Sequence, residues 1–195
     1  MHEKRACEFN IPCFVSELIL RLENEGESAY IVGGSLRDML LGNRPHDFDL
    51  ASSAEPLRVC EIFSDMRVIK TGLAHGTVTV ISHGEPVEIT TFRVDGEYID
   101  MRRPLHVEFT CRIEDDLSRR DFTVNAMAYN ESYGLIDLFG GAEDIKNGVI
   151  RTVGDPYEQS SLPTKTITIT ITSIRMANFQ FSKFVLTSEM QVYLR

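Results

Sequence analysis

The sequence has no run of eighteen apolar residues, and its first residues, MHEKRACEFN, lack the unbroken apolar stretch of a signal peptide. Membrane insertion and secretion are therefore not indicated, and we expect a cytoplasmic protein. Cysteine is also scarce, because Cys7, Cys13, Cys60 and Cys111 are scattered and form no Cys-x-x-Cys pair. This spacing argues against a disulfide framework and against a zinc site, so we expect reduced packing residues.

Positive charge is in short supply as well, since 20 lysines and arginines stand against 29 aspartates and glutamates, for a net charge of −9. This balance argues against a nucleic-acid partner, which is usually bound by neutralising phosphates. The positive charge is clustered, however, at Arg102–Arg103 and Arg119–Arg120, and the local field of a cleft matters more than the sum. The remaining composition, 43% hydrophobic and 25% charged over 195 residues, is typical of one globular domain with an extension.

One stretch, IVGGSLRDMLLGNRPHDFDL from Ile31 to Leu50, combines features of a metal site and a phosphate site. Its pattern predicts a strand, two glycines, a short helix, a polar loop and a second strand. Because alternate residues of a strand project from one face, Asp47 and Asp49 should point their carboxylates into one small volume. Such a pair suits a hard cation such as Mg²⁺, which takes oxygen ligands and often bridges to phosphate. Gly33 and Gly34 would let backbone N–H groups approach an anion at the start of the helix.

Each half of this stretch is commonplace alone, because a Gly-Gly pair is usually a tight turn and Asp-x-Asp is usually a solvated strand edge. The order GGSLRD, DFDLA, VEITTFR and RRDFTVNAMAYN is far more specific. It resembles the class II tRNA nucleotidyltransferases, which are the CCA-adding enzymes, and the closely related bacterial poly(A) polymerases. Both belong to the superfamily that includes DNA polymerase beta. The resemblance covers about residues 28–156 and implies an α/β (α+β) head domain, in which a mixed sheet carries helices on one side.

The resemblance also implies roles for acidic residues. Asp47 and Asp49 would hold Mg²⁺, and Glu88 would be the third carboxylate of the catalytic cluster. The alternation of Val87–Phe92 by itself explains Glu88 equally well as a solvent-facing residue of a half-exposed strand.

Further residues would bind the triphosphate. Backbone and hydroxyl groups of Gly33, Gly34 and Ser35 would contact its β- and γ-phosphates. Arg37 and Arg120 would pair with the same anion through planar hydrogen bonding. Without the resemblance, Arg120 is explained as the solvated end of a helix whose charges complement its dipole.

Periodicity and turn residues predict the other elements. Helices are expected at 11–22 with Asn10 as its cap, 36–41, about 56–64, 114–120 and 142–147. Strands are expected at 28–32, 47–51, 67–70, 75–81, 87–92, 124–129 and 135–138, with a hairpin turn at 82–85. We expect a mobile loop at 93–104, and in the resembling family a loop of this length favours addition of the terminal A.

The chain is expected to have three parts: an N-terminal helix packed on the head (1–27), the catalytic head (28–156) and an atypical, truncated neck (157–195). In the family the neck carries an E-D-x-x-R-x-x-R-A-x-R-F helix that pairs with the base of ATP or CTP. Here the strictly alternating run Lys165–Thr172 stands instead.

The resemblance implies template-independent addition of CCA, or of its terminal A, to tRNA 3′ ends from CTP and ATP. A poly(A) polymerase shares every motif and is the enzymatic alternative. A non-catalytic nucleotide-binding head is the alternative from another class. The sequence identifies no protein partner.

Overall fold

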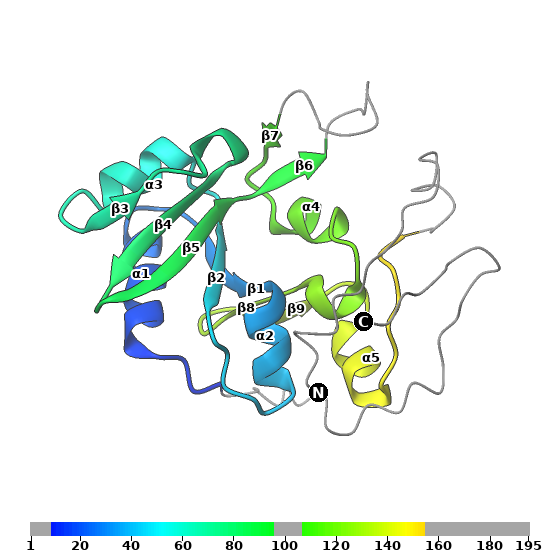
Figure 1. Cartoon of the computed structure of the whole chain (residues 1–195). Coiled ribbons are helices and arrows are strands. Elements are labelled where there is room, and N and C mark those ends of the chain that lie inside the picture. The colour runs from blue at the N-terminus through cyan, green and yellow to red at the C-terminus, as the bar shows by residue number, and fades with distance from the viewer. Residues whose placement is uncertain (1–8, 96–106, 155–195) are drawn as a thin grey trace.

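A seven-stranded mixed sheet forms the centre of the molecule (Figure 1), in a computed structural model that describes residues 9–95 and 107–154. Across the sheet the strands are β3 (Arg67–Ile69), β4 (Thr77–Ser82), β5 (Glu85–Thr91), β2 (Phe48–Ser52), β1 (Ala29–Val32), β8 (Met127–Asn130) and β9 (Gly134–Asp137). Only β2 and β5 run parallel; the other neighbours in this sheet are antiparallel. The mixed sheet expected from the sequence is therefore confirmed.

The helices lie between these strands in the chain. They are α1 (Cys13–Asn24), α2 (Gly33–Leu40), α3 (Pro56–Ile62), α4 (Ile113–Ser118) and α5 (Gly141–Asn147), with 3₁₀ turns η1 (Leu73–His75) and η2 (Thr123–Asn125). None of the helices in the described residues is long and apolar enough to cross a membrane.

The two faces of the sheet bury different clusters, because successive side chains of a strand point to opposite sides. The first cluster joins the sheet to α1 and α3 and includes Val15, Leu18, Leu22, Ile31, Leu50, Val59 and Ile89. The second joins it to α4 and includes Tyr30, Val32, Ala51, Phe92, Ile113 and Leu117. Helices thus cover both faces, and the expectation of helices on one side is wrong. Ile113 and Leu117, one helical turn apart, give α4 an apolar stripe of its own.

Local chemistry explains several boundaries. The two-residue turn between β4 and β5 places His83 and Gly84 at φ values of 54° and 86°, the left-handed conformation that a tight hairpin needs. The predicted hairpin is confirmed. The N-cap of α1 is Pro12 and not Asn10, and no side chain caps this helix. Proline is well suited to the start of a helix because it lacks the N–H that would be left without a partner.

The strand expected at 124–129 and the loop expected at 93–104 both differ from the structure. The strand expected from Val124 begins at Met127, because η2 comes first. The hydroxyl of Thr123 donates to the buried carboxylate of Asp144 at 2.7 Å, which ties this segment to α5 and favours a turn. The loop expected from Arg93 begins as strand β6 (Arg93–Asp95), which pairs with β7 (Val107–Phe109). The rest of that loop, the neck at 157–195 and Cys7 lie outside the described residues.

Candidate active site

Three carboxylates lie on the α4 side of the sheet. In the parallel register Asp49 of β2 stands directly opposite Glu88 of β5, and Asp47 precedes β2 by one residue. Phe48 and Leu50 are buried in the cluster of the opposite face, so Asp47 and Asp49 project toward the α4 side. The sequence predicted the shared direction of the two aspartates, and the strand pairing adds Glu88 to them.

The electrostatics of Asp49 record this crowding of negative charge. Burial, followed by the charges of Asp47 and Glu88, raises its pKa from 3.8 to about 6, and the positive charge of Arg120 opposes the shift. Asp49 is partly buried, whereas Asp47 and Glu88 are exposed. A cation placed between the carboxylates would relieve their repulsion.

The donor set fits a divalent cation that also takes ligands from a substrate. Among the described residues, no three Asp, Glu, His or Cys side chains stand ready as a complete set of ligands. Magnesium commonly binds through one or two carboxylates together with water and substrate phosphate oxygens. Asp47 and Asp49 match that mode of binding. Glu88 then lies beside the two metal ligands.

The glycine turn forms the opposite wall of the site. Helix α2 begins at Gly33, directly after β1 and three residues earlier than the sequence predicted, and Gly33 has a φ of 68°. A Cβ atom on Gly33 would lie 3.4 Å from Nη1 of Arg120 and 3.7 Å from Oδ2 of Asp49. The carboxylate and the guanidinium therefore meet over a glycine whose positive φ disfavours a side chain, and a Cβ there would be in van der Waals contact with both groups.

The other residues of the turn have defined partners. A Cβ on Gly34 would lie 3.4 Å from Nη2 of Arg37. Ser35 is buried, and its hydroxyl donates to the carbonyl oxygen of Val32 at 2.8 Å. This hydroxyl closes the turn, and its contact with phosphate stays a prediction.

Asn125 of η2 links the two arginines that the sequence assigned to the triphosphate. Its side-chain oxygen accepts from Nη1 of Arg37 at 2.8 Å, and its carbonyl oxygen accepts from Nη1 of Arg120 at 3.3 Å. Arg37 also donates to Asp38 through Nε and Nη2, at 3.2 and 3.0 Å. Sequence reasoning missed Asn125, because its role arises from contacts between distant segments.

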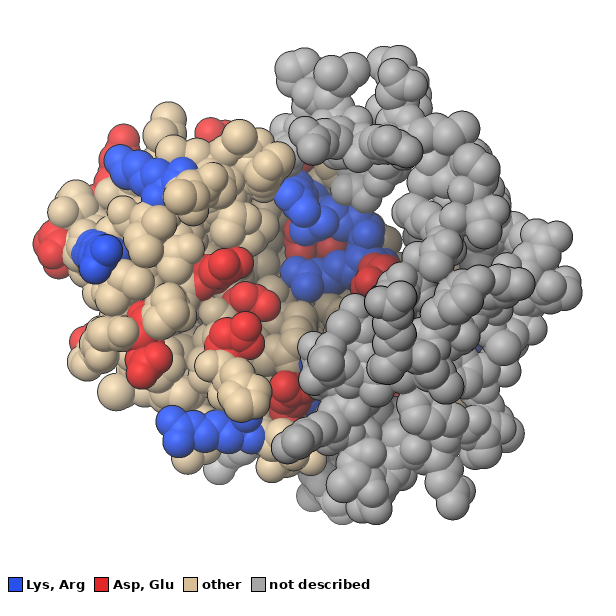
Figure 2. Space-filling model, viewed as in Figure 1, with Lys and Arg blue, Asp and Glu red and all other residues tan. Residues whose placement is uncertain are grey.

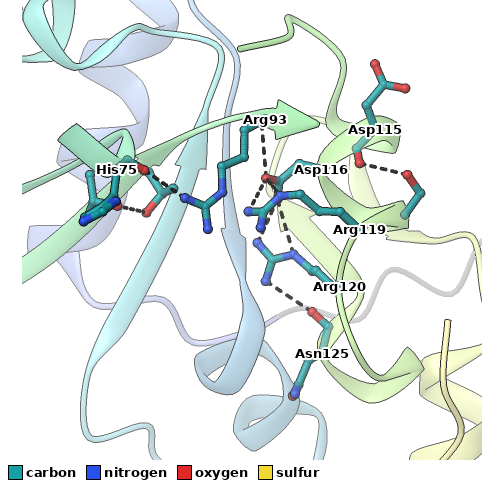
Figure 3. A network of polar contacts seen from close by, with 10 residues as sticks. His75, Arg93, Asp115, Asp116, Arg119, Arg120 and Asn125 are labelled. Atoms are coloured by element: carbon teal, nitrogen blue, oxygen red, sulfur yellow. Dashed lines mark hydrogen bonds and ion pairs between the residues drawn. The ribbon is translucent and has the colours of Figure 1, made fainter. Parts of the chain in front are cut away.

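Arg120 is further held by a buried carboxylate at the end of α4 (Figure 3). Asp116 is fully buried and accepts from both Arg119 and Arg120. Sequence reasoning missed Asp116 and Arg119 as members of the site. The spacing of three and four residues, which places side chains on one helical face, could have identified them. Figure 2 shows acidic and basic side chains gathered side by side on this face of the molecule.

Comparison with known proteins agrees with this geometry. A model of the poly A polymerase head domain matches residues 29–151, from β1 to beyond α5. The CCA-adding enzyme of Leuconostoc mesenteroides is 52% identical over 138 residues, which are 71% of this chain and 34% of that protein. The crystal structure of the Bacillus stearothermophilus CCA-adding enzyme in complex with CTP has a TM-score of 0.65 and 42% identity over 74% of this chain and 34% of that one.

A third relative is the Thermotoga maritima CCA-adding enzyme complexed with tRNA, with a TM-score of 0.56 and 29% identity over 74% of this chain and 34% of that chain. The chain thus spans about a third of the length of these relatives. The family model covers more than half of the 195 residues and includes the glycine turn, all three carboxylates and both site arginines. The chain therefore belongs to the poly A polymerase head domain family.

Proposed function

We propose that this chain is the catalytic head of an RNA nucleotidyltransferase that adds CCA, or its terminal A, to tRNA 3′ ends from CTP and ATP. One observation carries the proposal: Asp49 lies opposite Glu88 on one side and against the Gly33 turn and Arg120 on the other. A carboxylate pair for a cation is thereby joined to a cradle for an anion. Relatives named CCA-adding enzymes, described with CTP and with tRNA, support the choice of substrates. Because tRNA is the substrate, we assign the activity to the cytoplasm.

Membership in this family implies a divalent metal ion, and we propose Mg²⁺ held by Asp47 and Asp49. Two such ions would share the chemistry: one would lower the pKa of the attacking hydroxyl, and the other would neutralise the leaving pyrophosphate. The raised pKa of Asp49 supports the assignment, because burial and then the charges of Asp47 and Glu88 disfavour its ionised form, which a cation would stabilise.

The chain's own residues would bind and orient the substrates. The turn at Gly33 and Gly34 admits phosphate close to the backbone, and Arg37 and Arg120 neutralise it. The 3′-hydroxyl oxygen of the RNA loses its proton and forms a bond to the α-phosphorus, while the bond from that phosphorus to pyrophosphate breaks. Glu88, opposite Asp49, completes the acidic side of the site.

A transfer assay distinguishes the proposal from its two rivals. The chain is incubated with tRNA lacking CCA, labelled ATP or CTP, and Mg²⁺. Addition that stops at the CCA positions would support the proposal. Long A tracts would identify a poly(A) polymerase instead, and nucleotide binding without transfer would identify a non-catalytic head.

Substitution of the aspartates tests the metal assignment. We expect Asp47→Ala and Asp49→Ala each to abolish transfer while the far-ultraviolet circular dichroism spectrum is kept, since loss of a metal ligand removes catalysis and also relieves charge repulsion. Glu85→Ala is the matched control, because Glu85 is an exposed carboxylate at the start of β5. Near-normal transfer by both aspartate variants would disprove the assignment.

A further inference from the structure

Asp116 joins two arginines through one buried carboxylate. Its Oδ1 accepts from Nε and Nη2 of Arg119 at 3.0 and 2.7 Å, and its Oδ2 accepts from Nε and Nη2 of Arg120 at 3.3 and 2.9 Å. Oδ1 also lies 3.4 Å from the backbone nitrogen of Arg93, which donates to it. Each guanidinium presents the same edge to Asp116, so both are fixed in orientation as well as in position.

The charges of this group do not cancel. One carboxylate serves two guanidiniums, whose side chains are only 16% and 17% exposed. Asp116 alone therefore leaves one positive charge on the Arg119–Arg120 pair, which Asp49 offsets in part on the Arg120 side. A charge in such surroundings is stabilised by a counter-ion, which here must be an anion. The side chain of Arg93 donates to the carbonyl oxygen of His75 at 2.8 Å in the same region (Figure 3).

The free edges of the two arginines differ. Nη1 of Arg120 donates to the carbonyl oxygen of Asn125 and lies at the Gly33 turn. Nη1 of Arg119 has no partner among residues 9–95 and 107–154. A guanidinium with one edge anchored and one edge open is ready to pair with a phosphate group.

We propose that Arg119 is a second phosphate-binding residue of the nucleotide site, and that Asp116 is the positioning residue that holds Arg119 and Arg120 as one unit against the triphosphate. The inference rests on the proposed function and extends it, because the sequence assigned the phosphate contact on this helix to Arg120 alone. The pair would bind the phosphate tail, which is common to all nucleoside triphosphates.

Inorganic tripolyphosphate, titrated calorimetrically into the 195-residue chain with Mg²⁺, tests the phosphate contacts without a base. Arg119→Ala should weaken binding about tenfold, the expected loss of a charge-assisted hydrogen bond. Arg112→Ala is the matched control, since Arg112 lies at the start of the same helix with a side chain 67% exposed, and it should bind as the wild type does.

Asp116→Asn gives the sharper test, because a purely electrostatic role and a positioning role predict opposite signs. Removing a negative charge beside two arginines should tighten anion binding if only the net charge matters. We expect weaker binding, by about five- to tenfold, because the arginines lose their fixed orientation. In an Arg119→Ala/Arg120→Ala background, Asp116→Asn should have no further effect on affinity.

The possible results distinguish a failure of this inference from a failure of the proposed function. If the wild type binds tripolyphosphate and Arg119→Ala binds it equally well, the inference is overturned and the proposed function stands. If Arg119→Ala loses affinity only for tRNA, the arginine contacts RNA phosphate and the inference is again overturned. If the wild type binds no tripolyphosphate, both fail. Should Asp116→Asn not fold, Arg119→Lys, which keeps the charge without the planar fork, should still lose part of the affinity.

Discussion

The pKa of Asp49 is set by effects that oppose one another. Burial and the charges of Asp47 and Glu88 favour its protonated form, and Arg120 favours its ionised form. A pKa of about 6 means that the first group of effects outweighs the second. Near neutral pH the carboxylate is largely ionised, so it is available as a metal ligand and at the same time destabilises the folded protein that carries it.

This residue makes a prediction about stability and pH. The folded state holds the Asp49 proton more tightly than the unfolded chain does, so its contribution to stability is greatest at low pH and is lost as the pH rises from 3.8 through about 6. Asp49→Asn should therefore raise the melting temperature at pH 7.5 by several degrees, equivalent to about 2–3 kcal/mol. Thermal unfolding of both proteins at pH 5 and pH 7.5 measures the effect.

The matched control is Glu85→Gln, which removes an exposed carboxylate from β5 and should leave the melting temperature unchanged. Equal pH dependence in the wild type and in Asp49→Asn would show that the pKa of Asp49 is not raised in the folded protein. The prediction applies to the chain without divalent metal, since a bound cation would lower the pKa of Asp49.

Helix α2 shows how the backbone conformation of the first residue can determine where a short helix begins. The sequence predicted a start at Leu36 because glycine is a poor helix former. The helix starts at Gly33 instead, since the left-handed φ of 68° turns the chain from β1 straight into the first helical turn. The early start brings the backbone of Gly33 against Asp49 and Arg120.

Two glycines at opposite ends of α2 allow a matched experiment. Gly33 and Gly42 both have positive φ values, 68° and 75°, so alanine at either should cost about 1 kcal/mol in folding stability. Only Gly33 has neighbours near its missing Cβ, while nothing lies within 4 Å of that position at Gly42. Gly33→Ala should therefore weaken ATP binding several-fold and Gly42→Ala should not. Equal affinities in the two variants would remove Gly33 from the site.

Local sequence patterns predicted individual elements well, but they predicted poorly on which face of the sheet the helices pack. The β4–β5 hairpin and the face shared by Asp47 and Asp49 follow from turn residues and from alternation, which act over a few positions. The position of α4 on the second face was not predictable in this way. Its sequence, IEDDLS, shows only Ile113 and Leu117 as apolar residues, and the buried Asp116 contradicts the pattern of an amphipathic helix.

The residues of the site also fall into those that local sequence predicts and those that only the structure shows. The glycine turn and the aspartates are contiguous in sequence, so their chemistry could be predicted. Glu88 was predicted through the family resemblance, and the structure adds its register opposite Asp49. The Asn125 link and the Asp116 anchor became evident only from the packing, because they join distant segments or use a buried polar group.

For the whole molecule, the net charge of −9 conceals a separation of charge. Acidic side chains lie on β2 and β5, and Asp116 gathers arginines at the end of α4 (Figures 2 and 3). A site with both signs can hold a cation and a polyanion together. The overall charge therefore does not argue against phosphate binding, because a cleft responds to its local field.

Base selection is predicted to be weak in this chain. Discrimination between bases needs side chains that pair with the base edge, and the E-D-x-x-R-x-x-R-A-x-R-F pattern that does so in the resembling family is absent after Pro156. The phosphate contacts proposed above would be the same for every nucleotide. Calorimetric titration with ATP, CTP, GTP and UTP in Mg²⁺ should give weak and similar affinities. A preference above roughly tenfold, about 1.4 kcal/mol, would contradict the prediction.

The parallel pairing of β2 with β5 also determines when the site can form during folding. Parallel neighbours cannot be joined by a tight turn, and between Ser52 and Glu85 the chain passes through α3, β3, η1 and β4. The β4–β5 and β8–β9 hairpins close over short loops, whereas the β2–β5 register must wait for the whole crossover to be ordered. Asp49 and Glu88 become neighbours only at that late stage. The repulsion between Asp49 and Glu88 therefore arises only after the crossover is ordered, whereas Asp47 and Asp49 are neighbours from the start because they lie two positions apart in sequence.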